Sequence, residues 1–432
     1  MKPLTLLLFS AVLTFAQNQT DSQLNQGDTR QRVRAVRELA NKGQDAVPQI
    51  APYLKDIDIS VRLETVKALD DIGGPKTVDA LVQAARDNDP EMQIRAADGL
   101  VNVYLPGYLK SGLSGSLKRA GTSIRAKFTD TNDQIIDPYV EVPPAVIEVL
   151  GRQTRGGSSV ESRANAARAL GILRGQAAVP DLLQALNSKD DRLMYESLVA
   201  LEKIRDPAAG PGLAFLLRDL DDKVQIAALQ ATGILRNKSA APDVRDVLDH
   251  ARTVKIRREA LTTLAMIADP ADHGVFLRYL SDRDDGLRAA GAEGLARLKD
   301  PADRPVLEKA FEAERANNPR LSMAFAVVSL GSRVVSEFSP LQYLINTLNS
   351  KAYRNVAISF LTELARDPEV RQAIYPILSQ ATRDEKTGIG VVLARSGDRD
   401  SERYLDALAK DSDPEVTQEG LRSLRILRNR IQ

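Results

Sequence analysis

Residues Glu161–Arg174 read ESRANAARALGILR, and the spacing of their apolar positions decides the fold. These positions recur in steps of three and four, which places them on one face of a helix: Ala164, Ala167, Leu170, Ile172 and Leu173. A helix of roughly four turns is only marginally stable alone in water. Ala166 and Ala169 add little side chain, so another helix can approach closely. We therefore expect this helix to pack against neighbours of its own kind.

The same helix recurs along the chain. With Leu170 as the marker, the equivalent positions are Leu39, Leu69, Leu100, Leu201, Thr232, Leu264, Leu295, Leu330, Leu364, Leu393 and Leu424. Most steps between markers are 30 to 35 residues, a period that indicates a solenoid. The step from Leu100 to Leu170 is 70 residues instead of about 31, so about 39 residues are inserted there.

The strongest regularity lies eleven residues before the marker. Nine copies carry a residue there that suits a helix N-cap: Asp28, Asp58, Asp89, Ser159, Asp190, Asp221, Thr253, Asp284 and Asp413. Five arginines share the position four residues after the cap: Arg32, Arg62, Arg163, Arg257 and Arg288. Such an arginine either bonds the capping aspartate of an adjacent copy, which would form a ladder, or is solvated on the helix surface.

A shorter amphipathic segment precedes each capped helix, for example residues 77–86, 179–187, 208–218, 244–251 and 271–280. Proline after aspartate, as in Asp206-Pro207 and Asp269-Pro270, ends one helix and starts the next. The repeated unit is therefore predicted to be an antiparallel helix pair.

This unit resembles the HEAT repeat, and most closely the short bacterial form also called the PBS-lyase-like HEAT repeat. The resemblance lies in an aspartate before a Val-Arg step (Asp58, Val61-Arg62) followed by Ala-x-x-Ala-Leu-Gly-x-Leu. It covers Asp28 to Gln432 apart from the insertion. It implies an all-α fold, an α-solenoid forming a right-handed superhelix of about eleven or twelve helix pairs. In that family the second helix of each pair generally lines the concave face.

The N-terminal segment is expected to be a secretory signal peptide over residues 1–16, with one lysine, an apolar run and a cleavage site before Gln17. The alternative is a retained anchor. Residues 17–27 are polar and predict a flexible leader, and no later stretch predicts a membrane span. We therefore expect export, to the periplasm or the cell exterior, and the absence of cysteine fits an oxidising compartment without proving it.

Between the repeats of residues 28–103 and 143–432 lies the predicted insertion, residues 104–142. Its basic half and its aromatic residues suggest a binding loop, because aromatic and arginine side chains are enriched in binding surfaces. The candidate contacts are Tyr108, Lys118, Arg119, Arg125, Lys127, Phe128 and Tyr139. The alternative is a degenerate repeat whose aromatic side chains pack on neighbouring helices.

Catalytic chemistry finds little support in the sequence. There is no cysteine nucleophile, and the two histidines, His250 and His273, stand next to Ala251 and Gly274. Some HEAT-repeat enzymes bind iron through His-Glu dipeptides, and those are missing here. The recurrent Asp-Asp pairs are interpreted as caps. We predict no catalytic residues, no cofactor and no metal. The formal charge of +1, with both signs mixed along every repeat, argues against nucleic acid as a partner.

The function predicted from these patterns is that of an exported scaffold binding a protein or peptide partner along its concave face and possibly through the insertion. Candidate contacts on the second helices are Arg62, Arg95, Arg192, Arg257 and Arg288. Two alternatives stay open: a HEAT-repeat enzyme or lyase-type protein, and a structural component of an envelope assembly. The partner and the oligomeric state are left open.

Overall fold

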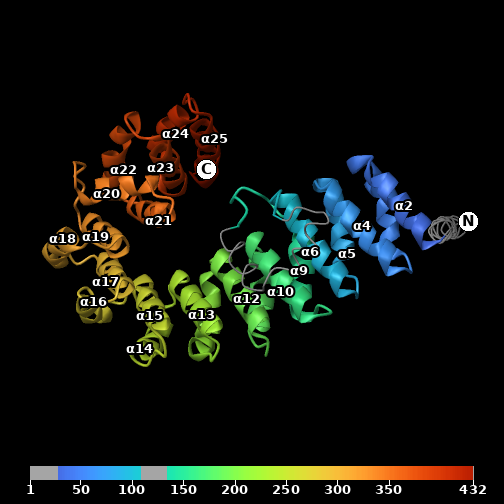
Figure 1. The fold of residues 1–432 in the computed structure, drawn as a ribbon, viewed down its shortest axis with the longest axis horizontal. Coiled ribbons are helices and arrows are strands. Elements are labelled where there is room, and N and C mark those ends of the chain that lie inside the picture. Colours follow the sequence, from blue (N-terminus) through green and yellow to red (C-terminus); the bar gives the residue numbers. More distant parts are fainter. Residues whose placement is uncertain (1–27, 109–133, 432) are drawn as a thin grey trace, which may run out of the picture. The chain divides into compact units, whose positions relative to one another are not determined.

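The computed structural model describes residues 28–108 and 134–431, and the regular structure of these residues is entirely helical. Contacts divide them into two compact units (Figure 1). The first unit holds residues 28–108, 134–136 and 140–209, and the second holds 137–139 and 210–431. Across the described ranges, no helix combines the length and the apolar content needed to cross a membrane.

The first unit alternates first helices with second helices, and three of its four first helices are shorter than every second helix. Its first helices are α3 (Val47–Ile50), α5 (Val78–Ala84), α9 (Pro144–Gly156) and α11 (Val179–Ala185). Its second helices are α2 (Thr29–Ala40), α4 (Ile59–Ile72), α6 (Pro90–Tyr104), α10 (Val160–Ile172) and α12 (Asp191–Ile204). Each second helix lies against the next one along the chain, so the unit is a stack.

The second unit continues the alternation. Its second helices are α13 (Asp222–Ile234), α15 (Val254–Ile267), α17 (Asp285–Leu298), α19 (Asn317–Ser329), α21 (Arg354–Leu364), α23 (Arg383–Ser396) and α25 (Pro414–Ile431). Its first helices are α14 (Ala241–Asp249), α16 (His273–Tyr279), α18 (Arg304–Ala313), α20 (Pro340–Asn346), α22 (Pro368–Ile374) and α24 (Glu402–Leu408). In Figure 1, α15, α17 and α19 follow the inner side of this unit's arc, and α14, α16 and α18 the outer side.

Most 3₁₀ helices are short and lead into or extend the first helices, whereas the 12-residue Pro207–Arg218 takes the place of a first helix before α13. The 3₁₀ helices are Gly43–Ala46, Ala51–Lys55, Pro75–Thr77, Gln176–Ala178, Pro207–Arg218, Lys238–Ala240, Pro270–Asp272, Pro301–Asp303, Thr347–Asn349, Tyr375–Ser379 and Arg399–Ser401. Proline opens several of them, because its missing N–H is not needed at a first helical position.

The core consists of the predicted markers and the side chains that surround them. Leu69, Leu100, Leu170, Leu201, Thr232, Leu264, Leu295 and Leu393 are completely buried. One prediction was wrong: Leu330 lies just beyond the end of α19 and is half-buried. The residue eleven positions after the N-cap Ala316 is Val327, which is completely buried and therefore occupies the marker position.

Small residues let successive second helices approach closely. A Cβ atom added to Gly171 of α10 would lie 2.7 Å from the Cα of Ala200 in α12. That distance is shorter than carbon atoms tolerate, so a larger residue would push the two helices apart. The alanine-rich and glycine-containing pattern of residues 161–174 thus reflects helix-to-helix contact.

All nine predicted N-caps are confirmed. Each of these side chains accepts a hydrogen bond from a backbone N–H in the first turn of its second helix. The Ser159 cap forms a reciprocal capping box with Ser162. The sequence thus encodes where second helices begin.

The predicted arginine ladder exists, but its usual partner is a different carboxylate. Arg32 and Arg62 bond Asp56 and Asp87, which stand two residues before the next cap, at 2.7 and 2.8 Å. Those aspartates also accept a bond from the N–H of the capping residue. A carboxylate at this position can therefore fix the next turn and bind the preceding helix, whereas the capping aspartate is already occupied by its own helix.

The other members of the arginine set vary. Arg288 bonds Glu314, again two residues before the next cap, at 2.7 Å. Arg163 donates to the carbonyl of Thr154 instead. Arg257 forms no ion pair among the described residues. The neighbouring Arg258 does bond a capping aspartate, Asp284, at 2.7 Å.

A buried ion pair links α10 to α12. The Arg168 guanidinium bonds the Glu196 carboxylate, with its Nε 3.1 Å from Oε2. The side chains are 11% and 4% exposed. Burial acts to lower the pKa of Arg168, but the Glu196 carboxylate outweighs it and raises that pKa. Buried charges such as these stabilise the fold only when both partners are present, because either one alone would be buried without compensation.

Replacing Asp284 by alanine tests the caps. The change removes the acceptor for the Leu287 N–H and the partner of Arg258, so we expect a loss of about 1–2 kcal/mol at neutral pH. The bond from Arg258 is the largest influence that lowers the pKa of Asp284. The stabilisation that the Asp284 carboxylate provides is therefore lost as the pH falls through its native pKa. The free energies of unfolding of the wild type and the variant should become equal in acid. Urea unfolding at both pH values measures this. Glu312→Ala, at an exposed site on α18, is the control, and equal stabilities at neutral pH would contradict the prediction.

The buried pair gives a second prediction. Glu196→Ala leaves the Arg168 guanidinium buried without its carboxylate and should cost about 3–5 kcal/mol of unfolding free energy. The double variant Arg168→Met, Glu196→Leu removes both charges and should recover much of that loss. Denaturant unfolding of the three proteins measures the coupling. Additive losses in the double variant would show that the pair does not act as a unit.

Candidate functional site

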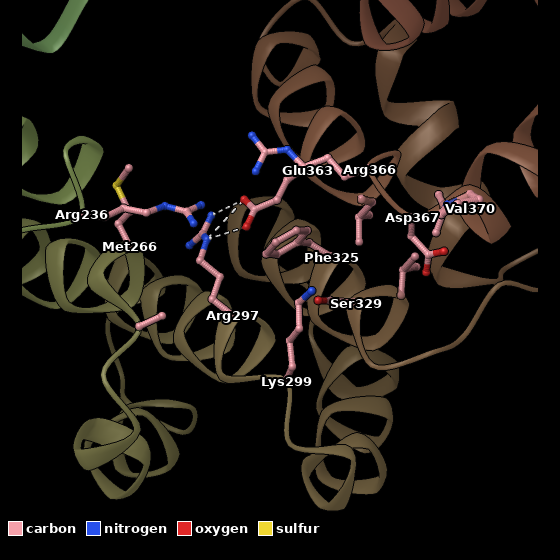
Figure 2. A pocket seen from close by; sticks show the side chains of 14 residues that line it. Arg236, Met266, Arg297, Lys299, Phe325, Ser329, Glu363, Arg366, Asp367 and Val370 are labelled. Carbon is pink, nitrogen blue, oxygen red and sulfur yellow. Dashed lines mark hydrogen bonds and ion pairs between the residues drawn. The ribbon is translucent and has the colours of Figure 1, made fainter. Parts of the chain in front are cut away.

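A pocket of about 460 Å³ lies at the carboxyl ends of successive second helices in the second unit. Figure 2 shows the side chains that line it. They come from the ends of α13, α15, α17, α19 and α21 and from the turn into α22. The site is therefore assembled from several repeats, and no single repeat contains it.

The floor of the pocket is apolar and rigid. Phe325 of α19 stacks on Phe360 of α21, with ring centres 4.5 Å apart and planes 13° from parallel. Phe325 and Val328 are almost completely buried, whereas Met266 is half-buried. The phenyl stack holds α19 against α21, so the shape of the floor is fixed before any ligand arrives.

Arg297 stands on this floor and is neutralised. Its guanidinium carbon lies 5.2 Å from the centre of the Phe325 ring. It bonds Glu293 of its own helix at 3.0 Å. It also bonds Glu363 of α21 at 3.1 Å (Figure 2). Burial acts to lower the pKa of Arg297, but the two carboxylates outweigh it and raise that pKa. Arg297 therefore cross-links α17 to α21 with its charge already compensated.

The carboxylate of Asp367, at the edge of the pocket, is also occupied by structural interactions. It caps α22 by accepting the Glu369 N–H at 2.9 Å, and it pairs with Arg333. Burial acts to raise the pKa of Asp367, but these two interactions outweigh it and lower the pKa. The carboxylate is held charged in a structural role.

Three cations around the pocket remain without a carboxylate. Arg236, Lys299 and Arg366 are exposed lining residues, and within residues 28–108 and 134–431 their side chains form no hydrogen bond or ion pair. Of the ionisable lining residues, four are cations and two are carboxylates. Within the described residues, the pocket therefore has positive charge that no carboxylate compensates, beside an apolar floor.

These cations were missed by the sequence analysis. Arg236 and Lys299 lie four residues after the markers Thr232 and Leu295, and comparing that position across the copies would have drawn attention to them. The pocket itself has no such signal, because side chains separated by more than 100 residues meet there only in the folded stack.

Tyr108 is a correction to the predicted binding loop. Its side chain is 8% exposed and therefore cannot serve as a surface contact. Burial raises the pKa of the Tyr108 hydroxyl, and the Asp98 carboxylate adds to this. The nearby Arg168 of α10 acts in the opposite direction and lowers that pKa. This end of the insertion thus packs on second helices, as its alternative interpretation expected of the aromatic residues.

The other described end of the insertion is also attached. The Ile136 N–H donates to the carbonyl of Ile172 at 3.0 Å, and Arg174 donates to the Ile136 carbonyl at 3.1 Å. Lys203 of α12 donates to the carbonyl of Gln134 at 3.1 Å. Both ends therefore lie against α10 or α12. The candidates between them, Lys118, Arg119, Arg125, Lys127 and Phe128, lie outside the described residues.

The remaining candidates are less available than expected. Tyr139 is half-buried, and its hydroxyl donates to Asp137 at 3.0 Å. Four of the second-helix candidates are partly buried and already form ion pairs, which corrects their assignment as freely available contacts: Arg62 with Asp87, Arg95 with Glu91, Arg192 with Glu161, and Arg288 with Glu314 and Asp285. Arg257 is half-buried as well. The ion pairs of Arg62, Arg192 and Arg288 connect successive repeats.

One cluster has the composition of a metal site. His273, Asp300 and Asp303 each offer a ligand atom within 4.8 Å of the others. The His273 Nε2 lies 3.0 Å from both carboxylate oxygens of Asp303, and Asp300 caps a 3₁₀ turn. One repeat earlier, Arg245 bonds Asp272 in a similar way. The cluster is thus explained as one more contact between successive first helices.

Comparison with known proteins places the repeats in a family. The model described as HEAT repeats matches residues 22–101 and 147–232. No curated protein matches the chain.

Among solved structures, the complex of CpcE and CpcF of phycocyanin lyase from Nostoc sp. PCC7120 is similar at 17% identity. That match covers 62% of this chain and 92% of the other, with a TM-score of 0.38. An engineered protein is similar at 20% identity. That match covers 88% of this chain and 98% of the engineered protein, also with a TM-score of 0.38. At these TM-scores neither likeness bears on function. The family match shows HEAT repeats over residues 22–101 and 147–232, and the stacked helix pairs of the described residues form an α-solenoid.

Proposed function

We propose that this protein is an exported, non-catalytic scaffold that binds a protein or peptide partner along the inner side of its second helices. The main contact is the pocket of the second unit, and the insertion of residues 104–142 is a second candidate contact. The observation that carries the proposal is an apolar floor beside three cations that have no partner among residues 28–108 and 134–431. Binding surfaces use such a combination for affinity and orientation.

The polar contacts between second helices favour binding. Gln230 bonds Glu259 at 3.2 Å, Ser322 bonds Glu293 at 3.0 Å, and Arg297 spans α17 and α21. Side chains held in this way lose little further freedom when a partner arrives. A preorganised surface binds more tightly than a mobile one for that reason.

The state of the carboxylates argues against acid–base catalysis as the task of the pocket. A general acid or base needs a pKa near the working pH. The pKa of Asp367 is instead lowered by its helix N–H and Arg333, and Glu363 is engaged by Arg297. Such groups hold charge in place, which suits recognition.

Site-specific photo-crosslinking in living cells tests the binding surface. A photoreactive amino acid at Met266 or Ser329 lies in the pocket lining, whereas one at Arg278 or Lys309 lies on the exposed part of α16 or α18. We expect the two pocket positions to crosslink to the same partner and the two control positions to give no such product. Equal crosslinking from all four positions, or only from the controls, would contradict the proposal.

Export is tested separately. If residues 1–16 are a cleaved signal, the mature protein recovered from the cell envelope or medium should begin at Gln17. N-terminal sequencing of the native protein, after fractionation, measures this. A chain that keeps Met1 and stays in the cytoplasmic fraction would rule out this part of the proposal.

A further inference from the structure

One residue, at the first or second position after the end of each of five consecutive second helices, has a left-handed backbone. These residues are Arg174, Arg205, Arg236, Ala268 and Lys299, with φ between 51° and 61°. Glycine is the usual choice for this conformation, and a side chain there costs about 1 kcal/mol. Four of the five are nevertheless arginine or lysine. A positive charge is favourable beside the free carbonyl groups at the end of a helix. This local interaction accounts for arginine or lysine at these positions.

Ala268 interrupts this series of cations. It has the same backbone conformation as its neighbours but a side chain of one carbon. Ala268 lines the pocket together with Arg236 from the copy before it and Lys299 from the copy after it. The pocket therefore lies where a long side chain is missing from an otherwise continuous row.

The charge around this gap is available to a ligand. Arg297 is neutralised by Glu293 and Glu363, and Asp367 by Arg333. Arg236 and Lys299, by contrast, have no partner within the described ranges, and the same holds for Arg366 at the far edge. A ligand that carries negative charge gains from all three cations without breaking an existing ion pair.

We infer that the pocket binds an acidic peptide segment that carries one bulky apolar side chain between carboxylates. The carboxylates pair with Arg236, Lys299 and Arg366. The apolar side chain enters the gap beside Ala268 and rests on the half-buried Met266. This inference rests on the proposed function and specifies the chemistry of the partner.

The arrangement of the cations favours a peptide over other anions. They come from the ends of α13, α17 and α21, with α15 and α19 between them. Separate charges on an extended chain match such spacing better than one compact anion. A nucleic-acid base could not stack on Phe325, because that ring is only 1% exposed. The half-buried Met266 suits an aliphatic or phenyl group instead.

A synthetic probe tests the chemistry directly. The probe is a fluorescent peptide of glutamates with one central phenylalanine, titrated with the full-length mature protein and followed by anisotropy at low salt. Replacing its glutamates by glutamine, or its phenylalanine by alanine, should each weaken binding about tenfold or more. Equal binding of the glutamine peptide would overturn the role of charge, and equal binding of the alanine peptide the role of the apolar group.

Variants of the protein locate the binding. Each of three single variants removes one cation: Arg236→Gln, Lys299→Asn and Arg366→Gln. Each should lower the affinity for the probe severalfold, and the triple variant should lower it further. Ala268→Gln fills the gap with an uncharged side chain of the length that neighbouring copies carry, and should also weaken it. Arg205→Gln is the matched control, because Arg205 has the same left-handed position but lies in the first unit. Thermal unfolding of every variant checks that the fold is retained.

Four outcomes would overturn the inference: no binding of the probe, unchanged binding to the pocket variants, equal weakening by Arg205→Gln, or displacement by a single-stranded oligonucleotide at lower concentration than by the unlabelled peptide. Crosslinking from Met266 and Ser329 remains an independent measure of the proposed function. If those positions capture a partner in cells while the acidic probe fails, the scaffold function stands and the inferred chemistry falls.

Discussion

Every helix pair in this chain has an apolar face that only a neighbouring pair can cover. Leu170 is completely buried because α6 and α12 lie on either side of α10. The close approach of Gly171 to Ala200 shows how little space separates these helices. Stability therefore depends on contacts between nearest neighbours, as in other repeat proteins, and not on a single globular core. Caps and ion pairs fix the geometry of the stack.

Local features of this fold could be predicted from the sequence, and features that depend on several repeats could not. The nine caps and most markers were predictable because each is decided within one helix and its preceding turn. The register of α19 was missed because its N-cap is Ala316, which has no capping side chain, and Glu314 instead accepts the N–H groups of Arg315 and Ala316 just before the helix. The pocket was missed because it depends on how four or more repeats pack.

The distribution of charge separates structural from functional candidates. Most arginines on second helices, such as Arg62, Arg168 and Arg297, are bound to carboxylates that belong to another repeat or another helix. Their charge serves packing, so they were poor candidates for partner contacts. The cations left for a partner stand just after the helices, where the turn holds them outside the inter-helix contacts. Arg236 and Lys299 are of this kind.

Hydrogen exchange of the full chain carrying Leu170→Asp tests the nearest-neighbour account most directly. A buried charge in α10 breaks the contacts of that helix with its neighbours. The account predicts fast exchange in α6, α10 and α12 and near-native protection in α21, α23 and α25. Uniform loss of protection along the whole chain, or native protection throughout, would contradict it.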